Sequence, residues 1–190
     1  MRRSKVKVGC GNITLMPSDF AIVNAANPRC LGGGGVDGSI HRAAGPELRE
    51  HCAQWAELCY QPGVRLRVGE ARVSPSFNLG MKGIIHTVGP MFPEGRMPSY
   101  PGEVISSSPE EDLENCLRSC LKMAEYVTDK VAFPAISCGV YGCPIHVFAE
   151  CAFRVFYEQD WALDIVMFVL FTEDELDQFQ SKWNGLWLKR

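Results

Sequence analysis

The sequence has no excess of basic residues, no long apolar run and no apolar signal region after its basic start. Each absence excludes a class of protein. The 190 residues include 19 Lys and Arg against 22 Asp and Glu, for a formal net charge of −3. Nucleic acid is therefore not expected as the main partner, because proteins that bind phosphate backbones usually present a basic face. No apolar run approaches the ~18 residues of a membrane span, so no membrane partner is expected. We expect a cytoplasmic protein, with the nucleus and the mitochondrion as alternatives.

No CxxC pair occurs among the nine cysteines. The closest spacings, Cys116 with Cys120 and Cys138 with Cys143, do not have the form of a zinc site. Disulfide frameworks are typical of short secreted chains, so we expect free thiols in a reducing compartment. The GxSxG, HExxH and P-loop signatures are absent as well. We therefore expect no metal site and no cofactor.

Short apolar runs alternate with amphipathic stretches, which is typical of an α/β fold. The length, with 46% hydrophobic and 22% charged residues, fits one domain over residues 1–190. The predicted strands are Lys5–Val8, Phe20–Asn24, Glu70–Ser74, Gly83–Thr87, Lys130–Phe133 and Ile165–Leu170. The predicted helices are Gly38–Ala44 continuing into Pro46–Leu58, then Pro109–Val127, Ile145–Glu158 and Glu173–Trp183. Met91–Ser108, rich in Pro, Gly and Ser, is interpreted as a surface loop or insertion and the one long irregular stretch.

Two glycine-rich segments each follow a predicted strand and precede a predicted helix. The first runs from Asn24 to Gly38 and contains four consecutive glycines, and the second runs from Ser137 to Gly142. Ligands of open α/β sheets bind beyond the carboxyl ends of the strands, where both segments lie. Glycines let backbone amides approach an anion, and a following helix adds its N-terminal partial charge. The pair predicts a pyrophosphate site.

Two alternatives stand beside this interpretation. Either segment alone could be an ordinary turn. Gly33-x-Gly35-x-x-Gly38 also matches the dinucleotide fingerprint formally. That fingerprint places its first glycine directly after the strand, whereas seven residues separate Asn24 from Gly32. A nicotinamide dehydrogenase is therefore the less favoured enzyme.

Three blocks, VNAANPRCLGGGGVDGSIHRAAGPEL, IIHTVGP and FPAISCGVYGCPIH, occur in this order. Together they resemble the macrodomain family, specifically its MacroD-like branch. The resemblance implies a three-layer α/β/α sandwich around a central mixed, mostly parallel sheet. It further implies metal-independent hydrolysis of ADP-ribosyl esters, with O-acetyl-ADP-ribose and mono-ADP-ribosylated Asp or Glu of proteins as substrates. We expect a monomer.

The resemblance also assigns roles to residues. Asp37 would orient or deprotonate the attacking water, and Asn27 would hold the distal ribose beside Asn24. Asn12 would accept a hydrogen bond from the adenine amino group, and Phe171 would lie at the adenosine end. The residues expected to contact the ligand are Asn12, Ile13, Asn24, Gly33, Gly34, Gly35, Val36, Ser137, Cys138, Gly139, Val140, Tyr141 and Phe171.

The residues themselves agree with these roles but leave alternatives. Asp37 is the only acid in the glycine-rich segment, although it could instead cap the helix predicted after Gly38. Asn12 stands where the family usually has Asp, and it could merely shape the turn after the first strand. Cys138 and Cys143 replace a small hydroxyl residue and an aromatic residue; Cys138 is interpreted as filling its loop, not as a nucleophile.

The histidines and the catalytic step leave two further questions. His41, His86 and His146 are interpreted as structural histidines. A reader module that binds ADP-ribose without cleaving it is the alternative to a hydrolase, and the presence of both Asp37 and Asn27 favours the hydrolase.

Overall fold

Six strands form one sheet in a computed structural model that describes residues 5–188. The strands are β1 Lys5–Cys10, β2 Ala21–Ala26, β3 Ala71–Ser74, β4 Gly83–Val88, β5 Lys130–Pro134 and β6 Ile165–Leu170. Their order across the sheet is β1-β6-β5-β2-β4-β3, and among them only β3 runs antiparallel to its neighbour. The predicted mixed, mostly parallel sheet is confirmed.

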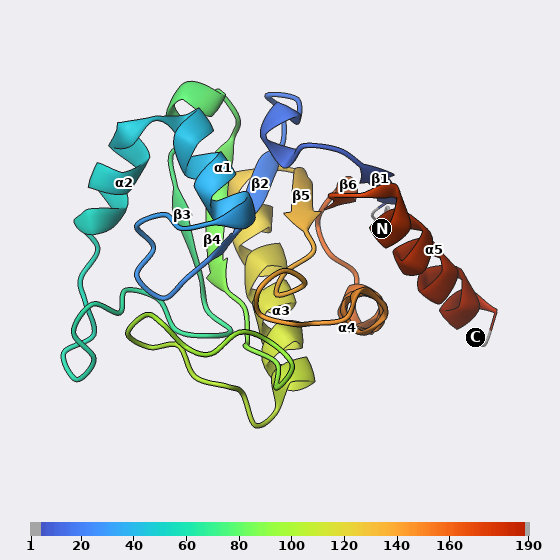
Figure 1. Cartoon of the computed structure of the whole chain (residues 1–190). Coiled ribbons are helices and arrows are strands. Elements are labelled where there is room, and N and C mark those ends of the chain that lie inside the picture. The colour runs from blue at the N-terminus through green and yellow to red at the C-terminus, as the bar shows by residue number, and fades with distance from the viewer. Residues whose placement is uncertain (1–4, 189–190) are drawn as a thin grey trace.

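Helices cover both faces of the sheet, which gives the predicted three layers (Figure 1). The helices are α1 Gly35–Ala44, α2 Pro46–Ala53, α3 Pro109–Val127, α4 Ile145–Glu158 and α5 Glu173–Trp187, with 3-10 turns η1 Ile13–Leu15 and η2 Phe77–Leu79. One buried cluster joins α1 and α2 to the sheet, and a second joins α3, α4 and α5 to the opposite face. All six residues of β4 are buried, as expected for a strand covered on both sides.

The start of α3 follows directly from its sequence. Ser108 precedes the helix, Pro109 occupies the first turn and three acids follow it. Proline is well tolerated there, and acids interact favourably with the positive end of the helix. The buried residues recur at helical spacing along one face of α3: Leu113, Cys116, Leu117, Cys120, Leu121 and Ala124.

The second predicted helix was too long. It ends at Ala53 instead of Leu58, because Trp55 turns inward and is buried with its ring 5.3 Å from that of His86. Burying an indole stabilises the fold more than another helical turn would. Residues 54–70 then contain neither helix nor strand, so Met91–Ser108 is not the one long irregular stretch.

Residues 91–108 also lack helix and strand, but their first part is anchored. Met91 and Phe92 are buried, and Met91 forms an isolated parallel bridge with Ile105. Within residues 5–188, no helix is both long and apolar enough to cross a membrane.

Candidate functional site

Five loops leave the same edge of the sheet, and four of them follow β1, β6, β5 and β2, which are parallel neighbours in that order. These four loops begin at Gly11, Phe171, Ala135 and Asn27, respectively. We call residues 27–34 the glycine loop and residues 135–144 the second loop. Because β2 pairs with β5, the two loops are neighbours, as a pyrophosphate site requires.

The glycine loop leads directly into α1. The helix begins at Gly35, three residues before the predicted start, and Gly34 occupies the N-cap. Asp37 therefore lies in the first helical turn, so the alternative that it caps the helix is wrong. A Cβ atom on Gly33 would lie 3.0 Å from Asn27 Nδ2 and 3.1 Å from Asp37 Oδ2. Gly33 thus brings the main chain close to both predicted catalytic side chains.

Asp37 is buried, with 4% of its surface exposed. Its Oδ1 accepts a hydrogen bond of 2.8 Å from Asn24 Nδ2, and its Oδ2 has no hydrogen-bond partner among residues 5–188. Burial raises the pKa of Asp37 to about 6, and the Asn24 hydrogen bond partly opposes that rise. A carboxylate with a pKa near neutral pH is well suited to accept a proton from water.

Asn24 lies beneath Asp37, and its expected place by the distal ribose stays a prediction. It is fully buried, and its Nδ2 also lies 3.1 Å from His86 Nδ1. The two hydrogens of Nδ2 can serve both acceptors, which assigns the proton of His86 to Nε2, 2.9 Å from Ser74 Oγ. Burial lowers the pKa of His86 to about 3, so the ring is neutral. His86 is thus a satisfied structural histidine, as predicted, and it also positions Asn24.

Asn27 shapes the turn that carries it. Its Oδ1 accepts a hydrogen bond of 3.0 Å from the Arg29 amide, and its Nδ2 donates to the Gly32 carbonyl at 3.2 Å. One hydrogen of Nδ2 remains, near Gly33 and on the side of Asp37. The two predicted catalytic residues therefore converge on one point of the glycine loop.

His41 was not predicted at the site. It follows Asp37 by one helical turn, and its Nε2 lies 3.5 Å from Asp37 Oδ1. Neither ring nitrogen is hydrogen-bonded within residues 5–188, so the interpretation as a satisfied structural histidine is wrong. Burial, and secondarily the charge of Arg49, lowers the pKa of His41. The spacing of four residues from Asp37 was the signal available in the sequence. His146 lies exposed on α4.

Both loops present backbone amides without internal acceptors. In the second loop, the amides of Gly139, Val140 and Tyr141 bond no acceptor among residues 5–188, while those of Cys138 and Gly142 do. In the glycine loop, the same holds for Gly33 and Gly34. The first-turn amides of α1 add further donors, because a helix start has no intrahelical acceptors for them. Such arrays of amides form anion sites.

The second loop is held from outside by the irregular segment 91–108. The amide of Phe92 donates to the Tyr141 carbonyl, and that of Arg96 donates to the Val140 carbonyl, both at 2.8 Å. Ser137, at φ 65°, starts the bend, and its buried Oγ has no partner among residues 5–188. The Cys138 thiol lies 3.5 Å from the Ile136 carbonyl, as a loop-filling residue would.

Glu103, in segment 91–108, holds that segment against the second loop through hydrogen bonds. Its side chain is 1% exposed and accepts hydrogen bonds from Tyr141 Oη at 2.5 Å, Arg96 Nη2 at 2.6 Å and the Ser99 amide at 2.8 Å. Burial acts to raise the pKa of Glu103, but these hydrogen bonds outweigh it and lower the pKa. Sequence analysis did not identify Glu103, because its partners lie up to 38 residues away.

We expect Glu103→Gln to lower the free energy of unfolding by about 1–3 kcal/mol at pH 7, since charged hydrogen bonds are replaced by neutral ones. A group with a lowered pKa in the folded state stabilises it above the unfolded pKa, so the loss should shrink as the pH falls. Urea unfolding from pH 7 to pH 3 measures this. Glu94→Gln, an exposed change in the same segment, is the control. Equal stability of the two variants at pH 7 would contradict the role of Glu103.

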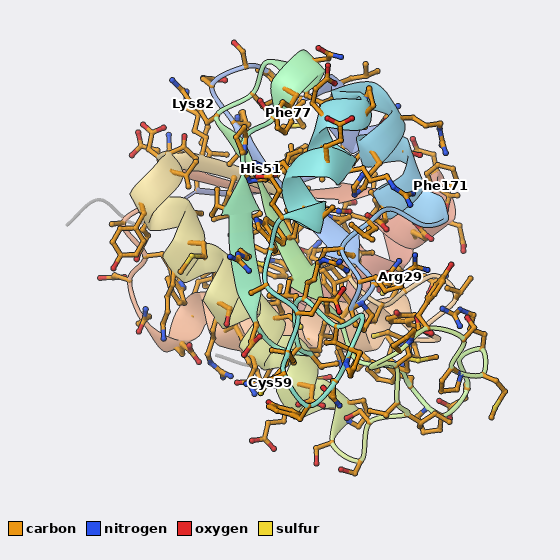
Figure 2. The ribbon with its side chains drawn as sticks, turned by 90° about the vertical axis from the view of Figure 1, so that its left-hand side faces the viewer. Arg29, His51, Cys59, Phe77, Lys82 and Phe171 are labelled. Atoms are coloured by element: carbon orange, nitrogen blue, oxygen red, sulfur yellow. The ribbon has the colours of Figure 1, made fainter. Side chains whose placement is uncertain are left out.

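The β1 and β6 loops differ in exposure. Phe171 is 84% exposed and lies at the periphery of the molecule (Figure 2). Ile13 is buried in the core, so only its main chain is available to a ligand. Asn12 Oδ1 accepts hydrogen bonds from both the amide and the hydroxyl of Thr14, which fills its acceptor capacity. Asn12 thus caps η1, the alternative considered from sequence, and any adenine contact must compete with this turn.

Known proteins show the same combination of sequence and fold. The family model described as Macro domain matches residues 23–152, which include both loops and Asp37. A macro domain-containing protein of Xanthomonas axonopodis pv. citri is 46% identical over 158 residues, 83% of this chain and 80% of that protein. An O-acetyl-ADP-ribose deacetylase of Salmonella gallinarum is 44% identical over 152 residues, 80% of this chain and 76% of that protein. The Oceanobacillus iheyensis macrodomain with ADP has a TM-score of 0.83 and 37% identity, covering 99% of this chain and 94% of that chain.

Proposed function

Because the chain belongs to the macro domain family, we propose that it binds ADP-ribose and hydrolyses ADP-ribosyl esters. The substrates proposed are O-acetyl-ADP-ribose and proteins carrying ADP-ribose on Asp or Glu. The observation that carries the proposal is the pair of amide arrays beside an unpartnered, buried carboxylate oxygen of Asp37. The relatives support its two halves, since one is named for O-acetyl-ADP-ribose deacetylation and another was solved with ADP.

In the proposed complex, the parts of the ligand follow the order of the loops along the sheet edge. The adenosine lies near Phe171 at the end of β6, and the diphosphate accepts hydrogen bonds from the second loop and the glycine loop. The distal ribose then reaches Asn27 and Asp37. Asp37 Oδ2 takes a proton from a water molecule as the water oxygen bonds to the carbonyl carbon of the ester. The bond between that carbon and the ribose oxygen then breaks, Asp37 returns the proton to the ribose oxygen, and the released acid ionises to a carboxylate in solvent. Asn24 and His86 hold Asp37 in place from below.

Product analysis tests the proposal. The protein is incubated with O-acetyl-ADP-ribose and with a glutamate-ADP-ribosylated protein, with and without EDTA. We expect free ADP-ribose from both substrates, and no effect of the chelator, because the proposed step uses no metal. Binding of ADP-ribose without turnover would identify a reader module instead. Activity lost in EDTA and restored by a divalent ion would refute the metal-independent mechanism.

The pH dependence of turnover follows from Asp37. With a pKa of about 6, the carboxylate is ionised above pH 6 and becomes protonated below it. We expect kcat/KM for O-acetyl-ADP-ribose to fall about tenfold per pH unit below that value, since only the ionised form accepts a proton. Initial rates between pH 4.5 and 8, with ADP-ribose affinity measured in parallel, check this. A flat profile across pH 5–7 would exclude Asp37 as the base.

A further inference from the structure

A hollow of about 530 Å³ lies where the glycine loop meets α1 and the start of α2. Its lining includes Gly32, Gly33, His41, Arg42, Pro46 and Arg49. We call it the arginine pocket. It shares Gly33 and His41 with the surroundings of Asp37, so it borders the proposed reaction centre.

The cations of this pocket have no carboxylate partner among residues 5–188. Arg42 Nη2 donates to Ser39 Oγ at 3.1 Å, and Arg49 Nη1 donates to the Leu31 carbonyl at 3.3 Å. In contrast, Arg118 and Arg154 each form ion pairs with several glutamates. One carboxylate, that of Glu47, approaches the rim, since a Cβ atom on Gly45 would lie 2.7 Å from its Oε2. Asp37, beside His41, is a second carboxylate at the border of the pocket. Neither carboxylate forms an ion pair with Arg42 or Arg49 among residues 5–188, so both guanidinium groups can bind an incoming anion.

His41 adds a buried polar group at the inner wall of the pocket. Its side chain is 10% exposed, and both ring nitrogens are buried without a hydrogen-bond partner within residues 5–188. Gly32 lies directly against the ring, since a Cβ atom there would be 3.3 Å from Cγ. A buried polar group without a partner is costly, and a bound ligand that supplies one would relieve the cost.

The pocket lies on the reacting side of the proposed ligand. The adenosine end, at β6, and the second loop, at β5, lie on one side of the glycine loop. The pocket lies toward α2, which packs against β3 at the opposite edge of the sheet (Figure 1). With the ligand placed as proposed, a chain esterified to the distal ribose would lie on the side of Arg42 and Arg49.

We propose that the arginine pocket binds an Asp or Glu side chain next to the modified residue, so that ADP-ribosyl esters within acidic sequences are preferred. This inference rests on the proposed function. Carboxylates suit the pocket because guanidinium groups bind them through two parallel hydrogen bonds. The negative charge that the pocket binds comes from the modified protein, so the ADP-ribose needs no additional charged group.

Binding of two non-cleavable ADP-ribosylated peptides tests the inference. The peptides differ only in their flanking residues, which are acidic in one and neutral in the other. Fluorescence anisotropy is expected to show about two- to fivefold tighter binding of the acidic peptide, the scale of an exposed ion pair. The ratio should fall toward one in high salt. It should be lost in Arg49→Gln and partly retained in Arg49→Lys, which keeps the charge but not the two parallel hydrogen bonds. Lys122→Gln removes the same charge from an exposed position on α3, so it should leave the affinity ratio unchanged.

Each variant is judged by the ratio of its affinities for the acidic and the neutral peptide. Because neither peptide is cleaved, this ratio does not depend on the hydrolase proposal. Equal affinities of wild type for the two peptides, or an unchanged ratio in Arg49→Gln, would overturn the inference. A salt-sensitive ratio in a protein that cleaves no ester would support the pocket and refute the hydrolase. Failure to bind ADP-ribose itself would overturn both.

Discussion

Asp37→Asn is expected to slow hydrolysis of O-acetyl-ADP-ribose by about 10²–10⁴-fold, the usual contribution of a general base. Asn has nearly the same shape and can still accept the hydrogen bond from Asn24, but it cannot take a proton from water. ADP-ribose should still bind, because the amide arrays of both loops are unchanged. Steady-state rates and calorimetric titration of the same variant separate the two effects.

The stability of this variant gives an internal check. The pKa of Asp37 is raised in the folded state, to about 6, so the ionised carboxylate opposes folding at pH 7. Replacing it with a neutral amide should leave the free energy of unfolding unchanged or higher. Asp177→Asn, an exposed change on α5, serves as the control for both measurements. Wild-type turnover by Asp37→Asn would remove Asp37 from the mechanism and favour water activation by the phosphate of the substrate.

Gly38→Ala is expected to weaken ADP-ribose binding by tenfold or more and to lower the free energy of unfolding by about 1–3 kcal/mol. The added Cβ atom would lie 2.4 Å from the Gly33 carbonyl oxygen, a main-chain atom that can move only with the glycine loop. Displacing that loop shifts its amides away from the diphosphate and from Asp37. Calorimetric titration with ADP-ribose and urea unfolding measure the two effects.

Gly185→Ala is the matched control, because Gly185 is also helical but a Cβ atom there meets nothing within 4 Å. Alanine has the higher helix propensity, so this variant should gain up to about 1 kcal/mol of stability and bind ADP-ribose normally. The two substitutions are thus expected to change stability in opposite directions. If Gly38→Ala bound ADP-ribose like wild type, close contact between α1 and the glycine loop would not be needed for the site.

Much of the fold was predictable because it depends on local patterns. The start of α3 was predicted from Ser108, Pro109 and the acids of the first turn, although the Ser108 side chain makes no capping hydrogen bond. The end of α2 was not, because the burial of Trp55 against His86 joins residues 31 positions apart in the sequence. The antiparallel direction of β3 likewise depends on its pairing with β4, which no local pattern records.

The sequence by itself determined the two glycine-rich loops and the single acid, Asp37, that accompanies them, since glycine content and spacing are local properties. Only the tertiary structure decided what each side chain does there. It placed Asn24 under Asp37, set His41 beside it and fastened Tyr141 to Glu103. The physical reason is that burial and hydrogen bonding depend on neighbours in space. The raised pKa of Asp37, on which the proposed chemistry depends, arises from that burial and from no feature of its own segment.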